Sequence, residues 1–251
     1  MHSDKTTNIA ILRSNVRDNQ NENVVLLKTG SLNPVHRTHI SNLVQTKEYL
    51  ERVYSFNVLG GYISPTHDEY VRGKLQNEFI SSKHRIEMCE KAIEESGQES
   101  WLSVDRAECM ASGFIDFERV SCSLYHFIND KLKLPKSVRV IYVSGLDLFN
   151  RCNGIDLLRN LKMGVAVVYR PEQRETLIKQ LAILDKNVFY VPIDDETKKT
   201  LVDISSTLIR KNFNSNEECE HLTYTSVLNY LRLIRKNQHM EETENEEMDV
   251  E

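Results

Sequence analysis

The sequence predicts an α/β fold with a doubly wound, mostly parallel sheet and helices on both of its faces. Short apolar runs rich in β-branched residues alternate with longer segments whose apolar residues recur at helical spacing. This alternation is typical of parallel strands joined by crossover helices. A chain of 251 residues, of which 40% are hydrophobic, is long enough for one such domain or at most two small ones.

The first half of the chain provides three strands and three helices. The first strand, Val24–Lys28, is apolar on both faces, as expected of a strand inside a parallel sheet. Two further strands are predicted near Phe56–Ile63 and over Trp101–Val104. Apolar residues at core spacing predict helices over Pro34–Arg52, Ser82–Ser96 and Phe117–Leu132.

The second half continues the same alternation. Its predicted strands are Val138–Val143, Gly164–Tyr169 and Val188–Val191, and its predicted helices are Leu157–Lys162, Glu172–Leu184, one that begins over Ser205–Lys211, and Thr225–Arg235. In parallel sheets ligands bind beyond the carboxyl ends of the strands. We therefore expect the turns at Gly30, Pro65 and Gly145 to lie at the ligand-binding edge.

The two ends of the chain differ in composition from the rest. Residues 1–21 are polar and lack sustained periodicity, which predicts a flexible lead-in to a domain over residues 22–236. Residues 237–251 are predicted to be an acidic disordered tail, because Glu241–Glu251 holds seven acids and no base. Without that tail 30 acidic residues face 32 basic ones, an excess too small to indicate nucleic-acid binding.

Hydropathy and cysteine use indicate the cellular setting. No apolar run approaches the ~20 residues that span a membrane, and the N-terminus lacks an apolar signal-peptide stretch. The five cysteines are irregularly spaced, as expected of free thiols in a reducing compartment. We therefore expect an intracellular protein, cytoplasmic or nuclear, that binds neither membranes nor nucleic acid and that could form a homo-oligomer.

The segment of residues 24–39 is the most informative part of the chain. Its strand breaks at Thr29-Gly30-Ser31, small residues that let a ligand approach the backbone. Asn33-Pro34 suits the start of a helix, which places His36 and His39 on one face of its first turns. The N–H groups at a helix N-terminus bind anions, and two imidazoles add donors. The segment therefore predicts a nucleotide-phosphate site.

Two other interpretations of this segment lack residues that they need. Zinc requires three or four ligands, no glutamate lies between the histidines, and no two cysteines form a C-x-x-C pair. A Walker loop requires G-K-[ST] after the glycine turn, and this is absent. The remaining pattern, G-S-x-N-P-x-H-x-x-H, resembles the HxxH nucleotidyltransferase superfamily, whose members join a nucleoside triphosphate to a phosphorylated partner and release pyrophosphate.

A second motif lies near the other end of the domain, at Asp203–Arg210. Ser205 can cap a helix, Ser206 and Thr207 add hydroxyl donors, and Arg210 can reach a phosphate. Taken alone, these residues fit an ordinary capped helix better than a site. Together with the upstream H-x-x-H, however, I-S-S-T-L-I-R resembles the C-terminal signature of the nicotinamide/nicotinic acid mononucleotide adenylyltransferases, and the chain looks like a divergent member of their eukaryotic type.

Further motifs keep the order of that family across most of the chain. They are Ser64–Leu75, His84–Met88, Trp101–Asp105, Gly145–Leu148 and Tyr169–Pro171. The resemblance implies a Rossmann-like fold and transfer of the adenylyl group of ATP to nicotinamide or nicotinic acid mononucleotide. The products would be NAD, or its deamido form, and pyrophosphate, and Mg²⁺ would be bound mainly through the ATP phosphates, with no protein side chain assigned to the metal.

The resemblance also implies roles for single residues. His36, His39 and Arg210 would be catalytic. Lys28 is named from its place at the strand end alone, as a weaker candidate for holding phosphate, because lysines at such an edge are usually solvated. ATP would be bound by Gly30, Ser31, Leu32, Gly145, Asp147, Arg170, Ser205, Ser206 and Thr207. The mononucleotide would be bound by Asn33, Tyr70, Glu108 and Arg72, the last standing where the family usually has lysine.

The chain departs from the family where the pyridine ring is bound. Relatives stack that ring on tryptophans, and the position matching one of them is Ala107, whereas Trp101, the only tryptophan, is expected in the core. Phe149, Tyr62 or Tyr70 could supply the aromatic face. Two alternatives thus stay open: another HxxH nucleotidyltransferase, such as a cytidylyltransferase or a pantetheine-phosphate adenylyltransferase, or a nucleotide-binding, chaperone-like protein with little turnover.

Overall fold

The computed structural model describes residues 1–160, 162–169, 185–193 and 204–248, with side chains described as far as residue 237. Its centre is a six-stranded sheet in which neighbouring strands are parallel. The strands lie in the order β3-β2-β1-β4-β5-β6 and are β1 (Asn23–Gly30), β2 (Asn57–Pro65), β3 (Leu102–Val104), β4 (Val138–Gly145), β5 (Met163–Tyr169) and β6 (Val188–Pro192). The predicted fold class is confirmed.

The sheet starts in its middle, because β1 lies between β2 and β4. From β1 the chain adds β2 and β3 on one side and then crosses to β4, β5 and β6 on the other. In doubly wound sheets ligands bind beyond the carboxyl ends of the strands, where the strand order reverses. Here that place is the end of β1 and β4, at Gly30 and Gly145.

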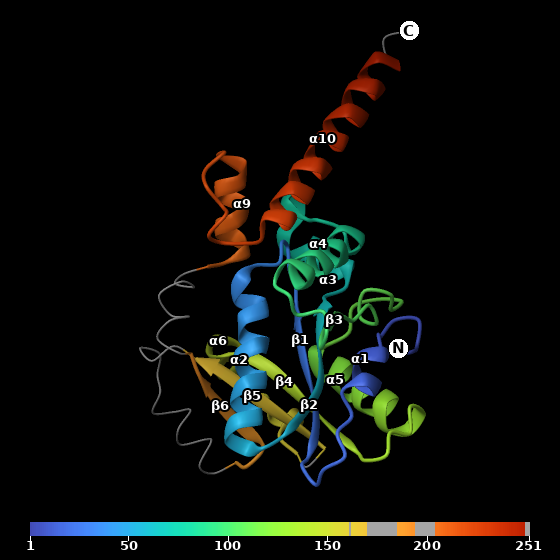
Figure 1. Ribbon diagram of the computed structural model, residues 1–251. Helices are drawn as coiled ribbons and strands as arrows, with labels where there is room; N and C mark the ends of the chain where they lie inside the picture. Colours follow the sequence, from blue (N-terminus) through green and yellow to red (C-terminus); the bar gives the residue numbers. More distant parts are fainter. Residues whose placement is uncertain (161, 170–184, 194–203, 249–251) are drawn as a thin grey trace.

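One face of the sheet is covered by α2 (Arg37–Tyr54) and α4 (Ser82–Glu95), and α10 (Thr225–Met248) packs on α4 (Figure 1). Helix α2 crosses five of the six strands, whereas α4 contacts β2 and β3 at the edge. Their apolar side chains form one continuous core with the strands, which includes Val24, Leu26, Leu43, Met88, Ile141 and Val227. The α2 face therefore holds the larger set of buried apolar residues.

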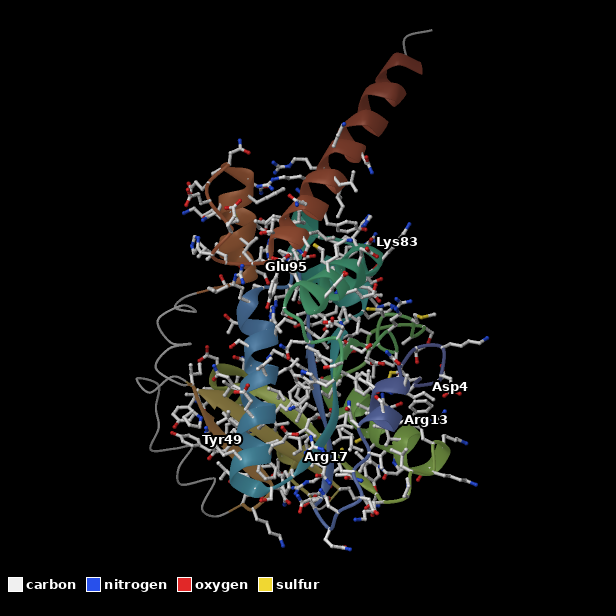
Figure 2. All side chains as sticks on the ribbon, viewed as in Figure 1. Asp4, Arg13, Arg17, Tyr49, Lys83 and Glu95 are labelled. Carbon is white, nitrogen blue, oxygen red and sulfur yellow. The ribbon has the colours of Figure 1, made fainter. Side chains whose placement is uncertain are left out.

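The opposite face is covered by α1 (Ala10–Ser14), α5 (Phe117–His126) with the π-helical turn Phe127–Lys131, and α6 (Leu146–Arg151). Side chains alternate along β1, so that Val25 and Leu27 enter this second core. Charged side chains such as those of Asp4, Arg13 and Arg17 lie on the outside of the fold (Figure 2).

Several predicted elements differ from the structure. The chain forms helix α3 (Asp68–Leu75) and helix α6 where the sequence indicated only turns. His67 caps α3 through its side chain, and two acidic residues in the first turn favour the helix. The predicted helix over Leu157–Lys162 is wrong, since the described residues of this range form only the 3₁₀ turn Asp156–Leu158. The predicted helix over residues 172–184 lies outside the described residues.

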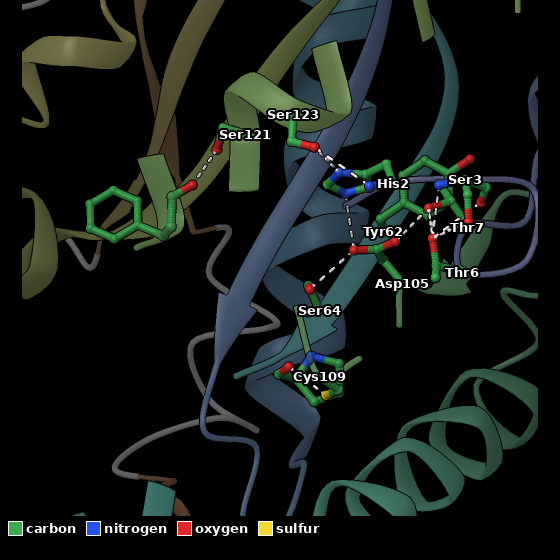
Figure 3. A network of polar contacts seen from close by, with 12 residues as sticks. His2, Ser3, Thr6, Thr7, Tyr62, Ser64, Asp105, Cys109, Ser121 and Ser123 are labelled. Carbon is green, nitrogen blue, oxygen red and sulfur yellow. Dashed lines mark hydrogen bonds and ion pairs between the residues drawn. The ribbon is translucent and has the colours of Figure 1, made fainter. Parts of the chain in front are cut away.

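The first 12 residues pack onto the sheet, so the prediction of a flexible lead-in is wrong for them. Ile11 and Leu12 are buried in the second core. Nε2 of His2 lies 3.2 Å from a carboxylate oxygen of Asp105, with neither side chain accessible, and Thr7 donates a hydrogen bond to Asp105 at 2.7 Å (Figure 3). Five residues of helix are too few to show a period in the sequence, which is why the packing was missed.

The C-terminal helix also runs further than predicted. Helix α10 was expected to end near Arg235 and to give way to a disordered tail, but it continues to Met248. The extra residues contain no glycine or proline, and glutamate and methionine favour helix. None of the helices in the described part of the chain is both long and apolar enough to cross a membrane.

Candidate active site

The loop after β1 turns through a buried leucine. Leu32 has a φ of 47° and is 2% exposed, whereas Gly30 has no positive φ. A Cβ added at Gly30 would meet only Leu32, at 3.8 Å. The left-handed conformation in this loop is thus adopted by Leu32, and Gly30 contributes open space above the strand end.

Helix α2 begins later than predicted, with His36 as its N-cap and His39 as its third residue. Backbone carbonyls that the predicted first turn would have used are taken by distant groups. The hydroxyl of Ser206 donates to the carbonyl of Pro34 and that of Thr223 to the carbonyl of Val35, both at 2.8 Å. These contacts hold residues 33–35 outside the helix.

The two histidine rings lie on each other, with centroids 3.6 Å apart and planes at 28°. Nδ1 of His39 accepts a hydrogen bond from the backbone N–H of His36 at 3.1 Å. A neutral imidazole has one donor and one acceptor nitrogen. Because Nδ1 is the acceptor, Nε2 of His39 carries the proton and is the free donor of that ring.

Both rings are neutral at pH 7. Burial and the nearby charge of Lys28 lower the pKa of His36 to about 3. Burial, His36 and Lys28 together hold the pKa of His39 well below its usual value. Nδ1 of His36 is buried and has no hydrogen-bond partner, so the ring has an unused polar atom at the start of α2.

Helix α9 (Ser206–Asn214) brings the second motif onto this loop. Its N-cap is Ser205, whose side chain accepts a hydrogen bond from the N–H of Leu208 at 3.1 Å, as predicted. Besides the bond from Ser206 to Pro34, Nη1 of Arg210 donates to the carbonyl of Asn33 at 2.9 Å. Two motifs more than 160 residues apart in the sequence are therefore joined by direct contacts.

Arg210 also contacts Glu78, a residue that the sequence did not indicate. Nε and Nη2 of Arg210 both lie 3.0 Å from Oε2 of Glu78. Nη2 is in addition 3.5 Å from the hydroxyl of Thr207. The guanidinium is thus held at the edge of the site by groups of the protein itself.

Asn33 is placed differently from its predicted role in substrate binding. Its side chain is fully buried, donates to the carbonyl of Glu78 at 2.8 Å and accepts from the N–H of Ile80 at 2.9 Å. The amide thereby fastens the turn over residues 76–80 to the phosphate loop. Because both ends of the amide are used and no surface is exposed, the structure assigns Asn33 to holding this loop, not to contacting a substrate.

Arg85 organises the same region, although the sequence motif gave it no role. Its side chain is fully buried. It donates to the carbonyls of Ile80 at 2.9 Å, Ser31 at 2.8 Å and Thr66 at 2.6 Å, and it pairs with Asp68 at 2.6 Å. One guanidinium therefore ties the ends of β1 and β2 to the start of α4.

The end of β4 lies beside the end of β1, as predicted. Gly145 caps α6, and a Cβ added to it would meet nothing within 4 Å. Asp147 stands exposed in the first turn of α6. Arg170, predicted to bind ATP, lies outside the described residues.

The predicted mononucleotide residues lie on the β2 and β3 side of the sheet. Tyr70 is 45% exposed and stacks on Phe114, with ring centroids 4.7 Å apart. Arg72 is exposed, and its guanidinium lies over the ring of Phe79 at 4.7 Å. The side chains of Tyr70 and Phe114 thus form an accessible pair of aromatic faces, and sequence spacing gave no signal for Phe114.

Glu108 is 1% exposed, and its Oε2 has no hydrogen-bond partner. Burial raises the pKa of Glu108 to about 8, although hydrogen bonds from Thr66 and His67 oppose this. A carboxyl group that is largely protonated at pH 7 can donate as well as accept a hydrogen bond.

The other aromatic candidates belong to the core. Tyr62 and Phe149 are fully buried, so neither offers a face to a ligand, and Tyr70 is the one of the three that does. Trp101 is 7% exposed and packs in the core, as expected. Ala107 is 2% exposed, so the position matched to the family's tryptophan lacks the open surface that a stacking position needs.

Comparisons with known proteins show the family to which the chain belongs. The family described as cytidylyltransferase-like matches residues 27–212. The nicotinamide/nicotinic acid mononucleotide adenylyltransferase of Arabidopsis thaliana is 30% identical over 218 residues, which cover 83% of this chain and 87% of that protein. Nicotinamide/nicotinic acid mononucleotide adenylyltransferase 2 of Xenopus tropicalis is 36% identical over 110 residues, 44% of this chain, but the match spans only 32% of that protein's length.

Two solved structures share the fold. The nicotinic acid mononucleotide adenylyltransferase of Plasmodium falciparum complexed with NaAD aligns with a TM-score of 0.61 and 13% identity, covering 86% of this chain and 97% of that one. The complex with APC gives a TM-score of 0.57 and 15% identity, with 86% and 96% covered. The fold is thus shared over nearly the whole domain, and the sequence matches show that the chain belongs to the cytidylyltransferase-like family and, within it, to the nicotinamide/nicotinic acid mononucleotide adenylyltransferases.

Proposed function

We propose that the protein transfers the adenylyl group of ATP to nicotinamide or nicotinic acid mononucleotide, giving the dinucleotide and pyrophosphate. The observation that carries this proposal is the contact of α9 with the phosphate loop, through Ser206 on Pro34 and Arg210 on Asn33. It gathers neutral imidazole donors, a helix N-terminus and a guanidinium at the strand-order reversal of the sheet, where phosphates bind in doubly wound folds.

The chemistry requires positioning and charge stabilisation only. The phosphate of the mononucleotide is already anionic and attacks the α-phosphorus of ATP in line, so no serine or cysteine nucleophile is needed. The Nε2–H of His39 would donate to the phosphate oxygens as negative charge moves to the leaving pyrophosphate. Ser206, Thr207 and Arg210 would hold the outer phosphates, with the guanidinium exchanging Glu78 for them.

A divalent cation, which we propose to be Mg²⁺, would neutralise part of the triphosphate charge when bound. In the part of the chain that the structure describes, no three His, Cys, Asp or Glu side chains cluster in a way that could hold a metal. We propose that the metal is carried mainly by the phosphates. Asp147, exposed at the start of α6, is a described carboxylate at this edge that could contact it.

The pyridine ring of the mononucleotide would stack on the exposed pair formed by Tyr70 and Phe114, which replaces the tryptophans of relatives. Glu108, with its unpartnered oxygen, would lie in the same half of the site. Because Glu108 is 1% exposed, a direct contact of its carboxyl with the substituent of the pyridine ring would require the loop after β3 to move. Stacking alone does not distinguish the acid from the amide, so we propose that both mononucleotides are accepted.

Pyrophosphate release tests the proposal directly. The protein is incubated with Mg²⁺ and ATP together with nicotinamide mononucleotide, nicotinic acid mononucleotide or phosphopantetheine, and in a further reaction CTP replaces ATP. Release only with ATP and a pyridine mononucleotide is expected. Release with CTP or phosphopantetheine would assign the chain to another branch of the superfamily, and ATP binding without release in any reaction would indicate a nucleotide-binding protein.

We propose that the protein works inside the cell, in the cytoplasm or the nucleus. All five cysteines are free thiols, and free thiols persist in reducing compartments, whereas oxidising compartments convert them to disulfides. We also propose that the chain can form a homo-oligomer. Fractionation and light scattering test the two statements.

A further inference from the structure

Lys28 is a buried cation at the reacting edge of the sheet. It lies two residues before the end of β1 and is 8% exposed. Side chains alternate along a strand, and Val24 and Leu26 both enter the core under α2. The side chain of Lys28 therefore extends on the α2 side, toward the end of the helix at which His36 and His39 stand.

The surroundings of Lys28 confirm this direction. Nζ is 3.5 Å from the carbonyl of Val143 in β4, the strand next to β1 where the strand order reverses. The charge of Lys28 is also near enough to lower the pKa values of both His36 and His39. The ammonium group thus lies between the ends of the two central strands and the histidine pair.

The ammonium group is poorly satisfied where it lies. It can donate three hydrogen bonds, and among the described residues its one contact, with the carbonyl of Val143, is at the long limit. No carboxylate of the described residues lies within the 4.0 Å of an ion pair, since the described ion pairs do not include Lys28. Burial of an unpaired charge is unfavourable, so the position favours an anion, and none of the carboxylates in the described part of the chain supplies one.

We propose that Lys28 is a further phosphate-binding residue of the active site, whose Nζ contacts the triphosphate of the nucleotide beside Nε2 of His39. This inference rests on the proposed function. A positive charge from Lys28 would help to bind the triphosphate, because both imidazoles are neutral and Arg210 is also paired with Glu78. Burial lowers the pKa of Lys28 to about 8, which leaves the group largely protonated at pH 7.

If Lys28 has only a structural role, replacing it should not weaken the binding of phosphates. Replacing an unpaired buried ammonium by the apolar side chain of methionine, which has similar length, removes an unfavourable burial in either case. Lys28→Met should therefore unfold at a higher temperature without ligand. Only a phosphate-binding lysine would combine this gain with a loss of affinity for phosphates.

The test is calorimetry on the wild-type protein, Lys28→Met and the control Lys83→Met, which removes an exposed lysine on the outside of α4 (Figure 2). The ligands are inorganic tripolyphosphate, ATP with Mg²⁺, and nicotinamide mononucleotide. We expect Lys28→Met to weaken tripolyphosphate and ATP about tenfold or more, the usual effect of losing a hydrogen bond between charged groups. Mononucleotide binding should change less than about twofold, and Lys83→Met should match the wild type.

A second measurement uses the wild-type protein alone, in case the variant does not fold. An amine-specific acylating reagent is applied with and without tripolyphosphate, and modification of Lys28 and Lys83 is followed by mass spectrometry. Tripolyphosphate should slow labelling of Lys28 and not of Lys83. Equal affinities in Lys28→Met and wild type, or unprotected Lys28, would overturn the inference while leaving adenylyl transfer intact. A wild-type protein that binds neither ATP nor tripolyphosphate would overturn the proposed function as well.

Discussion

Arg210 directs two of its nitrogens, Nε and Nη2, to a single oxygen of Glu78, each at 3.0 Å. The Glu78 side chain is 47% exposed, so the pair contributes little, about 0–1 kcal/mol. A phosphate carries more charge and accepts a bidentate fork equally well. The arrangement therefore keeps the guanidinium ordered near Asn33 and still lets it move onto a nucleotide at small cost.

The first prediction concerns that exchange. Lysine cannot reproduce the planar fork of arginine, so Arg210→Lys should raise the Michaelis constant for ATP more than that for the mononucleotide. Glu78→Gln removes the competing charge and should leave the ATP constant unchanged or lower it. Steady-state kinetics on both variants checks this. An equal rise for both substrates in Arg210→Lys would mean that α9 does not bind the triphosphate.

A second prediction separates the two contacts of His39. Its Nδ1 accepts the N–H of His36, whereas Nε2 is the free donor. Asparagine can keep the acceptor near the Nδ1 position but lacks the distal donor. His39→Asn should thus fold with near wild-type stability and lose about 10²-fold in turnover, the effect of one preorganised donor. His39→Ala should lose the same activity and about 1 kcal/mol of stability. If His39→Asn does not fold, the role assigned to Nδ1 is wrong. If it folds and keeps normal turnover, the role assigned to Nε2 is wrong.

The sequence predicted the strands and the capped helix of the second motif because these depend on local patterns, whereas the meeting of the two end motifs was expected from the resemblance to the family. Strand periodicity and the capped helix at Ser205 are encoded in a few neighbouring residues. Helix α2 starts at Arg37 because Ser206 and Thr223, far along the chain, take the carbonyls of Pro34 and Val35. No local pattern contains that information.

The same reason explains the site residues that the sequence missed. Arg85 acts on four groups from three separate segments, and nothing in the spacing of a helical arginine indicates this. Phe114 becomes relevant only because Tyr70 stacks on it. Ala107 was matched to a stacking position by motif order alone, and motif order carries no information on burial.

The third prediction tests Arg85. Arg85→Met would leave the carbonyls of Ser31, Ile80 and Thr66 without the arginine donor. It would also leave Asp68 without the opposite charge that it pairs with, although Ser82 still donates to it. Removing one member of a buried charged network costs about 3–5 kcal/mol. Urea unfolding should show a loss of this size. Lys83→Met, two residues earlier on an exposed face, is the matched control and should lose less than about 0.5 kcal/mol. A loss below about 1 kcal/mol in Arg85→Met would refute the network.

The fourth prediction is a pH dependence. The pKa of Glu108 is raised in the folded protein to about 8 from an ordinary value of 4.5. A carboxyl with a raised folded pKa contributes stability that is complete below the unfolded pKa and is lost as the pH rises through the folded pKa. The window is therefore pH 4.5 to 8.

Glu108→Gln removes this loss, because glutamine does not ionise. The free energy of unfolding of the variant should rise relative to wild type across that window, at up to about 1.4 kcal/mol per pH unit. Urea unfolding of both proteins at pH 5, 6, 7 and 8 gives the difference, and other titrating groups cancel in it. Parallel pH profiles would show that Glu108 ionises in the folded protein as it does in water.

The last prediction concerns the pyridine half of the site. Because Ala107 is 2% exposed, a tryptophan there has no open surface to occupy, and overpacking costs about 1–3 kcal/mol. Ala107→Trp should therefore lower the free energy of unfolding without tightening mononucleotide binding. Tyr70 is the accessible ring, and a stacked aromatic contributes about 0.5–1.5 kcal/mol beyond burial. Tyr70→Ala should thus weaken mononucleotide binding by a few-fold to about tenfold and leave ATP binding unchanged.

Tyr70→Phe is the matched control, since it keeps the aromatic face and removes only the hydroxyl. Calorimetry with ATP and with each mononucleotide on all three variants decides the matter. In Tyr70→Ala, the pyridine ring could still stack on Phe114, which contacts Tyr70 in the wild-type protein. The nearby ring of Phe79 is covered by the guanidinium of Arg72. If Ala107→Trp instead folds normally and tightens the mononucleotide alone, the loop over residues 105–113 opens in solution and the pyridine ring binds at Ala107, not on Tyr70.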